Sequence, residues 1–264
     1  MSRWTDPQYL REQQYRDPAN LGARAALHRR FSTNDYAWQL WVFDHLDLRA
    51  GARVLELGGG PGDLWVENRG RLPVSWHLTL TDLSPGMVRQ ARQRLGDQDR
   101  GFVYAAVDAR ALPFRPESFD RVIANHCLYH VPRRRDLLHE VYRVLVPGGR
   151  FYAATNGKEH MRELRELVSR FAPSADTANV VEPFCLENGE SQLREVFSTV
   201  RLRRQENGLL VTEPGAIVDY VRSYVSDERG GPGLAALESW VQGRIATHGA
   251  LTISKDAGMF AATK

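Results

Sequence analysis

The fold of this chain is decided by residues 54–65, which read VLELGGGPGDLW. An apolar run typical of a buried strand leads into a glycine-rich loop and then into the start of a helix. Glycines at 58, 60 and 62 let the backbone lie against a ligand where any Cβ would collide with it. Glu56 stands near the end of the strand and is expected to point into the same crevice. The stretch therefore predicts a site for a nucleotide-like cofactor.

The spacing of the glycines distinguishes between cofactors. A dinucleotide loop follows G-x-G-x-x-G, which brings the pyrophosphate onto an open helix N-terminus. Counted from Gly58 the third glycine position holds Asp63, and counted from Gly60 it holds Trp65. The Asp63 carboxylate suits the helix dipole but would repel a phosphate. Acidic residues on both sides of the loop favour a cofactor with cationic groups and no phosphate, such as S-adenosylmethionine (SAM). The alternative is that the loop is only a tight strand-to-helix turn in another α/β protein, and the acidic residues favour the cofactor site over it.

Composition limits the class of protein. The chain has 264 residues, enough for one large domain or one domain with a cap, and its 42% apolar and 25% charged residues are typical of a soluble globular protein. No apolar run approaches the roughly 18 residues of a membrane span, and no secretory signal is evident. Two cysteines do not make a disulfide framework, so we expect a cytoplasmic protein. The sequence leaves the oligomeric state open.

Charge gives no sign of a nucleic-acid partner. The net charge is only +3, and the arginines at 29–30, 133–135 and 201–204 form short clusters that read as solvated faces. We therefore expect the partner to be a small molecule and no nucleic acid.

Five strands alternating with helices predict a parallel sheet built from right-handed βαβ units. The strands are expected at 53–57, 76–81, 102–107, 119–124 and 150–155, and the helices at 63–71, 84–95 and 134–145. Beyond residue 157 the alternation loosens, with helices expected at 159–171, 190–197, 213–224 and 234–246 and strands at 200–204 and 259–262. We predict an N-terminal helical lid (1–48) and a core (49–264) that carries cap insertions at about 158–190 and 213–247.

Four of the expected strands end in polar residues, namely Glu56, Asp82, Asp108 and Asn125. Ligands of an open parallel sheet bind outside the carboxyl ends of its strands. There Glu56 can supply negative potential for the SAM ammonium, and Asp82 can accept hydrogen bonds from both ribose hydroxyls. Asp108 can accept from the adenine amino group. Asn125 would lie where methyl donor and acceptor meet.

Neighbouring residues complete the predicted cofactor site. Leu83 and Met87 can pack on the adenine face, and the amide of Ala109 can donate to a ring nitrogen. The alternative is that Asp82 and Asp108 only cap the segments that follow them. Four polar strand ends in register with a glycine loop favour the cofactor site. The residues predicted to bind SAM are Glu56, Gly58, Gly59, Gly60, Asp82, Leu83, Met87, Asp108, Ala109 and Asn125.

These segments resemble the class I SAM-dependent methyltransferases, in the type 11 group that includes ubiquinone/menaquinone-type enzymes. The matching segments cover the expected core in the family's order and read VLELGGGPGDLW (54–65), LTDLSPGMVRQAR (80–92), VDARALPF (107–114), FDRVIANHCLYHV (119–131) and RVLVPGGRFYAATNG (143–157). Gly59 departs from the family, where a cysteine or small residue is common, and we expect little effect.

The resemblance implies a Rossmann-like, mostly parallel sheet of seven strands with helices on both faces and an antiparallel last strand. It also implies methyl transfer to oxygen, nitrogen or carbon of a small molecule, in secondary metabolism or quinone-like biosynthesis, with S-adenosylhomocysteine (SAH) as product.

The reacting end of the site is expected after the fourth strand. Methyl transfer is an in-line displacement that depends on collinear alignment, and a base is needed only when the acceptor must lose a proton. His126, Tyr129 and His130 can face the acceptor and are the candidate catalytic residues. His126 and His130 also have the spacing of a metal pair, but no third ligand has a matching position, so we predict no metal. Polar residues predicted to line the substrate pocket or lid are Tyr15, Arg24, His28 and Asn156.

Three other functions share parts of this pattern. An RNA or nucleobase methyltransferase is the first alternative, although Asn125-His126-Cys127-Leu128 lacks the Asn/Asp-Pro-Pro-aromatic motif of adenine-amino enzymes and Cys127 does not follow a proline. A NAD-dependent oxidoreductase fails at the third glycine. A SAM-binding protein without turnover stays open.

Overall fold

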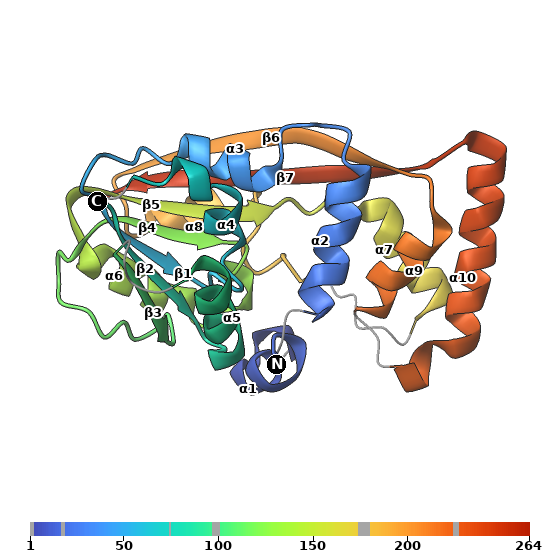
Figure 1. Ribbon diagram of the computed structural model, residues 1–264, viewed down its shortest axis with the longest axis horizontal. Coiled ribbons are helices and arrows are strands. Elements are labelled where there is room, and N and C mark those ends of the chain that lie inside the picture. The colour runs from blue at the N-terminus through green and yellow to red at the C-terminus, as the bar shows by residue number, and fades with distance from the viewer. Residues whose placement is uncertain (1–2, 17–18, 74, 97–100, 174–179, 224–226) are drawn as a thin grey trace.

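The chain folds around one mixed sheet (Figure 1). The computed structural model describes residues 3–16, 19–73, 75–96, 101–173, 180–223 and 227–264. Within these residues seven strands lie in the order β3-β2-β1-β4-β5-β7-β6. They are β1 (Arg53–Leu57), β2 (His77–Asp82), β3 (Phe102–Ala106), β4 (Phe119–Asn125), β5 (Leu145–Asn156), β6 (Thr199–Val211) and β7 (Leu251–Thr263).

The directions of the strands confirm the predicted fold. Strands β1 to β5 run parallel, whereas β7 runs antiparallel to both β5 and β6. The chain order reverses between β1 and β4, so the carboxyl ends of these two strands open the crevice in which ligands of such sheets bind.

Helices cover both faces of the sheet, because neighbouring residues of one strand point to opposite sides. In β4, Val122 packs with α6 (Arg134–Val144) and α8 (Gly189–Arg194) on one face. Ile123 packs on the other face with α3 (Trp38–His45), α4 (Asp63–Glu67) and α5 (Pro85–Leu95). Both strand residues are almost fully buried.

Helix α5 begins as the sequence predicts. The Ser84 side chain accepts a hydrogen bond from the Met87 amide at 3.3 Å, and Pro85 occupies the first helical position. This start places Leu83 and Met87 beside the carboxyl end of β2.

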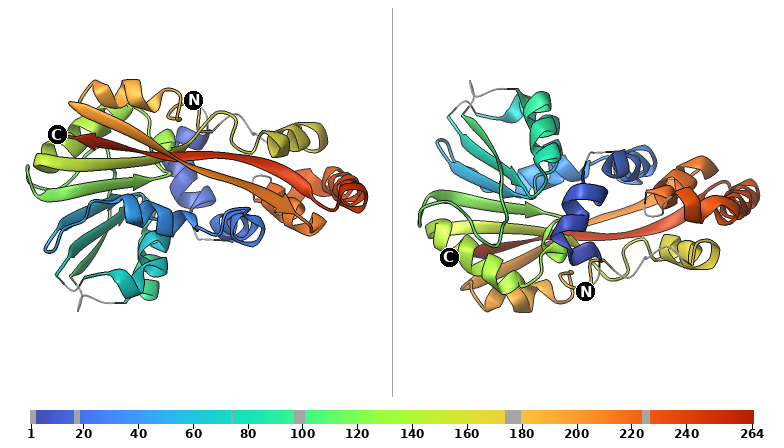
Figure 2. Two further views of the ribbon diagram at one scale, coloured as in Figure 1. Left: turned by 90° about the horizontal axis from the view of Figure 1, so that it is seen from above. Right: turned by 90° about the horizontal axis from the view of Figure 1, so that it is seen from below.

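A second hydrophobic core lies beyond the crevice, on the outer halves of β6 and β7 (Figure 2). It joins residues far apart in sequence, including Leu27, Leu164, Ile217, Leu237 and Ile253. These come from β7 and from the helices α2 (Ala19–Phe31), α7 (Arg162–Phe171), α9 (Pro214–Arg222) and α10 (Asp227–His248). Figure 1 shows α2 between the main sheet and the helices α7, α9 and α10.

Strands β6 and β7 are much longer than the predicted strands at 200–204 and 259–262. Residues 203–208 read Arg-Arg-Gln-Glu-Asn-Gly and residues 254–256 read Ser-Lys-Asp, so the apolar alternation that predicts a strand is interrupted. Pairing nevertheless continues through both segments, with Asn207 opposite Lys255. Both of these residues line the cavity described below, which explains why polar residues occur in the middle of the two strands.

The helices of the predicted lid and cap segments pack partly against the main sheet and partly in the second core. The N-terminal segment contains α1 (Pro7–Tyr9), a π-helical turn (Leu10–Gln14) and α2, whereas α3 packs against the main sheet. Segments 158–190 and 213–247 supply α7, α9 and most of α10. Residues 1–2, 17–18, 174–179 and 224–226 of the predicted lid and caps lie outside the described residues. The function of these helices as a cover stays a prediction.

Candidate active site

A cavity of about 1090 Å³ lies at the carboxyl ends of β1, β2 and β4 and extends to the second core. Single small-molecule pockets run from about 300 to 1,000 Å³, so this volume has room for a cofactor and an acceptor together. The predicted site residues that line it are Tyr15, Arg24, His28, Glu56, Gly58, Gly59, Gly60, Asp82, Leu83, Met87, Asp108, Ala109, Asn125, His126, Tyr129, His130 and Asn156. The fold therefore brings all of them together, and their individual roles stay predictions.

The cavity has two ends, which we name by their structure. The strand-end half is lined by residues 58–61 of the glycine loop, Glu56, Asp82 and Asp108. The hairpin half is lined by His28, Asn156, His160 and Lys255, which come from α2, the end of β5, the segment before α7, and β7.

The glycine loop leaves no space for side chains at two positions. Gly58 has φ +62°, and a Cβ there would lie 2.6 Å from the Cβ of Cys127. A Cβ at Gly59 would lie 2.8 Å from Oε2 of Glu56 and 2.9 Å from Cγ of Leu80. The absence of a side chain at 59 is thus required by the local packing of this chain, which makes Gly59 more important than the sequence indicates.

Glu56 is a buried carboxyl group below this loop, with 2% of its surface exposed. Its Oε2 accepts a hydrogen bond from the Trp65 indole. Burial, opposed by the Trp65 hydrogen bond and assisted by the charges of Asp82 and Asp63, raises the pKa of Glu56 to about 8. The strand-end half therefore favours a bound cation, because a cation would relieve the cost of ionising Glu56.

The Asp82 side chain connects the glycine loop to the start of α5 through hydrogen bonds. Its carboxylate accepts hydrogen bonds from the amides of Gly60 at 2.9 Å and Ser84 at 2.7 Å. Burial raises the pKa of this carboxyl group and the backbone amides lower it. Asp82 thus caps the segment that follows it, which is the alternative to ribose binding. Because Asp82 also lines the cavity, the two roles are compatible.

Asp63 does not act as the isolated anion that its sequence position indicates. Arg94 of α5 donates to Oδ1 of Asp63 at 2.5 Å and to the Pro61 carbonyl at 2.9 Å. The guanidinium offsets the repulsion that the Asp63 carboxylate would exert on a phosphate. The missing third glycine and the buried Glu56 are consequently the features that disfavour a dinucleotide.

Asp108 forms a bidentate pair with Arg110, which the sequence analysis missed. The guanidinium lies 3.0 Å and 2.6 Å from the two carboxylate oxygens, and this pairing lowers the pKa of Asp108. Arg110 also lines the cavity next to Ala109. The i, i+2 spacing of an acid and an arginine after a strand could have indicated the pair.

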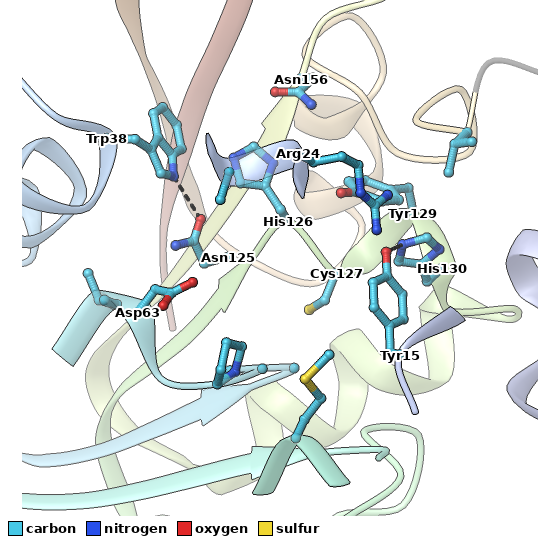
Figure 3. Close-up of a pocket in the computed structure, with 18 of the residues that line it drawn as sticks. Tyr15, Arg24, Trp38, Asp63, Asn125, His126, Cys127, Tyr129, His130 and Asn156 are labelled. Carbon is cyan, nitrogen blue, oxygen red and sulfur yellow. Dashed lines mark hydrogen bonds between the residues drawn. The ribbon is translucent and has the colours of Figure 1, made fainter. Parts of the chain in front are cut away.

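Asn125 is held by α3 at the centre of the cavity (Figure 3). The Trp38 indole donates to its Oδ1 at 3.1 Å, and its Nδ2 donates to Gln39 Oε1 at 3.2 Å. The next residue, His126, has φ +59° and its ring centre lies 5.0 Å from that of Trp38. Burial lowers the pKa of His126 to about 4, so its imidazole is neutral near pH 7.

Tyr15 and His130 form a hydrogen-bonded pair on the opposite side of the cavity in Figure 3, with the Tyr15 oxygen 2.9 Å from Nε2 of His130. Nδ1 of His130 lies 2.8 Å from the Trp4 carbonyl, which can only accept. Burial lowers the pKa of His130 to about 4, so the single proton of the neutral ring is on Nδ1. Nε2 therefore accepts from the Tyr15 hydroxyl.

Tyr129, Arg24 and Cys127 surround this pair. The ring of Tyr129 lies 4.6 Å from that of His130, and the Arg24 guanidinium carbon lies 5.8 Å from the centre of the Tyr15 ring. Sγ of Cys127 donates to the Leu57 carbonyl at 3.3 Å, and burial raises the pKa of its thiol. Cys127 is therefore poorly suited to act as a nucleophile.

Two further observations concern ions and membranes. In the described part of the chain, no group of three His, Cys, Asp or Glu side chains is arranged to hold a metal ion. Across the same residues, no helix combines the length and the apolar character needed to cross a bilayer.

Comparison with known proteins gives the family. A methyltransferase domain family matches residues 55–153. The ubiquinone/menaquinone biosynthesis C-methyltransferase of Methylococcus capsulatus is 34% identical over 137 residues, which cover 51% of this chain and 55% of that protein. The enzyme of the same name from Bordetella avium is 30% identical over 190 residues, covering 70% of this chain and 68% of that protein. The chain spans about half the length of the first curated relatives that it matches.

Solved structures agree on the fold. Phosphoethanolamine N-methyltransferase 2 of Haemonchus contortus, in complex with SAM, has a TM-score of 0.62 at 20% identity and is matched over 100% of this chain and 60% of that one. The YcgJ protein of Bacillus subtilis has a TM-score of 0.60 at 18% identity, over 86% of this chain and 97% of that one. The chain belongs to the class I SAM-dependent methyltransferases, in the type 11 group.

Proposed function

We propose that this protein transfers the methyl group of SAM to a small-molecule acceptor and releases SAH. The observation that supports this most strongly is the continuity of one cavity from the glycine loop to the hairpin half. Because the volume suits two ligands, donor and acceptor can meet inside it beside Asn125.

The strand-end half fits SAM. Bound SAM supplies a methyl group on a positively charged sulfur. The buried Glu56 carboxyl suits its ammonium, and Gly58, Gly59 and Gly60 line the cavity where its methionine part would lie. Asp82 would hold the ribose, and Asp108 with Ala109 the adenine edge, as the strand ends predict.

Asn125 and His126 would orient the acceptor. Both are fixed by Trp38, and a neutral His126 leaves no anion next to the transferring methyl group. This matters because an anion at that place would stabilise the cationic donor more than the transition state, in which the positive charge disappears.

Tyr15 and His130 would take the proton of an acceptor that must lose one. The acceptor proton passes to the Tyr15 oxygen as the Tyr15 proton passes to Nε2 of His130, whose other nitrogen is already bonded to the Trp4 carbonyl. Proton transfer to well-matched groups is worth about 10²- to 10⁴-fold in rate, and the lowered pKa of His130 makes it a weak base near pH 7, so we expect an effect toward the lower end of this range or below it.

The names of the relatives indicate only a broad chemical class of acceptor. Two relatives are named as C-methyltransferases of ubiquinone/menaquinone biosynthesis, so an aromatic or quinone-like ring is the first acceptor class to test. We place this reaction in the cytoplasm.

Two measurements test the proposed function. Calorimetry with SAM, SAH and NADH should show saturable binding of the first two only. A screen of metabolite pools with labelled SAM, followed by mass analysis of the product, should then identify the acceptor. Absence of SAM and SAH binding, or binding of NADH in their place, would refute the proposal.

A further inference from the structure

The hairpin half of the cavity contains a lysine that has no partner within the described ranges. Lys255 lies in the middle of β7, opposite Asn207 of β6, and its half-buried side chain lines the cavity. Among the described residues no side chain or carbonyl forms an ion pair or hydrogen bond with its ammonium group. Burial alone lowers the pKa of Lys255 to about 8, and no carboxylate opposes this effect.

Two histidines near Lys255 have unused nitrogen atoms. The backbone amide of Asp256 donates to Nδ1 of His160 at 3.1 Å, and burial lowers the pKa of this histidine far below its usual range. The neutral ring therefore carries its proton on Nε2, which is a hydrogen-bond donor. His28 lies beside it, with 6.1 Å between the ring centres, and Nδ1 of His28 is buried without a partner in the described part of the chain.

Six carboxylates of the described residues line the cavity, and none of them pairs with Lys255. Five belong to the strand ends or to α4, and the sixth is exposed between α2 and α3; they are Glu56, Asp63, Glu67, Asp82, Asp108 and Asp35. The nearest acid in sequence, Asp256, does not line the cavity and pairs with Arg204 at 2.5 Å. One end of the cavity thus collects acids, whereas the other presents an uncompensated ammonium group and imidazole nitrogens.

Even partial burial of a cation without a counter-ion is unfavourable, so the presence of Lys255 in a binding cavity indicates that the ligand supplies the opposite charge. We propose that Lys255, with His160 and His28, binds an acidic group of the methyl acceptor, a carboxylate or a phosphate. The ammonium group would carry the charge recognition, and Nε2–H of His160 would donate a hydrogen bond to a second oxygen of the same group. Acceptors whose cationic group would occupy this end are disfavoured by Lys255.

The identification of the bound anion as part of the methyl acceptor rests on the proposed function. The anion site itself can be tested without turnover. SAH-saturated protein is titrated with inorganic phosphate and, separately, with acetate, and binding is followed by calorimetry. We expect saturable binding of at least one probe. Binding of phosphate only indicates a phosphorylated acceptor, and binding of acetate only indicates a carboxylic acid.

Matched variants locate the site. Lys255→Met should weaken probe binding more than tenfold, whereas Lys255→Arg should retain most of it because the charge is kept. Lys158→Met is the control, since Lys158 is exposed and does not line the cavity. It should bind the probe like the wild type.

The outcomes separate the two proposals. SAH binding by each variant shows that the protein is folded and that the strand-end half is intact. If SAH binds but neither probe does, or if Lys255→Met binds the probe as tightly as the wild type, the anion site is overturned and the methyltransferase proposal stands. If SAH itself does not bind, the proposed function fails, whatever the anion titration shows.

Discussion

Replacing Glu56 by glutamine should stabilise the free protein near pH 7 and weaken its binding of SAM. Glutamine keeps an oxygen for the Trp65 indole but cannot ionise. In the wild type the folded state holds the Glu56 proton with a pKa of about 8, against a usual value of 4.5. Below pH 4.5 both folded and unfolded chains are protonated, so the full stability is present. As the pH rises through the window from 4.5 to 8, only the unfolded chain ionises freely, and stability is lost.

The size of the effect follows from the same numbers. Each pH unit in this window costs about 1.4 kcal/mol, so from pH 4.5 to pH 7 the wild type loses about 3 kcal/mol that Glu56→Gln does not lose. Denaturant unfolding of both proteins at pH 5, 6, 7 and 8, without SAM, measures the difference directly. Glu67→Gln is the control: this carboxylate lines the same cavity but is exposed, and it should show a much smaller difference.

Binding provides a second measurement of the same group. If the SAM ammonium is held by Glu56, binding at pH 7 should release a proton. The heat of binding should then depend on the ionisation enthalpy of the buffer in the wild type and not in Glu56→Gln. Parallel stability curves for wild type and variant between pH 5 and 8 would refute our account of the buried carboxyl group.

Three further substitutions test the cavity. Asp82→Ala removes the acceptor for the Gly60 amide and should weaken SAM binding more than tenfold by calorimetry; an unchanged affinity would contradict its assigned role. Gly59→Ala places a Cβ 2.9 Å from Leu80 Cγ and should cost about 1–3 kcal/mol, seen as a lower Tm, whereas an unchanged Tm would mean that the loop adapts easily. Tyr15→Phe should lower kcat of methyl transfer at least tenfold for an acceptor that loses a proton, with SAH affinity nearly unchanged; full activity would exclude the Tyr15–His130 relay.

The strand-end half of the site could be predicted from sequence because its chemistry is local. The glycine loop, Asp82, Asp108 and Asn125 each follow directly on an apolar strand, and parallel strands bring their carboxyl ends to one edge. The Ser84-Pro85 helix start was equally readable, since a cap depends on residues within one turn.

The hairpin half could not be predicted in the same way. Lys255 and His160 come together only through pairing of strands and packing of helices distant in sequence, and no spacing rule connects them. The polar residues at 205–208 have no alternation of their own, so the predicted strand ends at 204, and its continuation becomes evident only from the pairing with β7. Trp38, which fixes Asn125, reads equally well as a core aromatic residue.

The second core joins residues far apart in the sequence, and this has a consequence for synthesis. Leu27 and Phe31 of α2 leave the ribosome long before Leu251 and Ile253, which complete their packing. The apolar face of α2 therefore lacks these native contacts while the residues between α2 and β7 are made. Nascent chains, and products truncated before β7, expose this face, which makes them candidates for chaperone binding and aggregation.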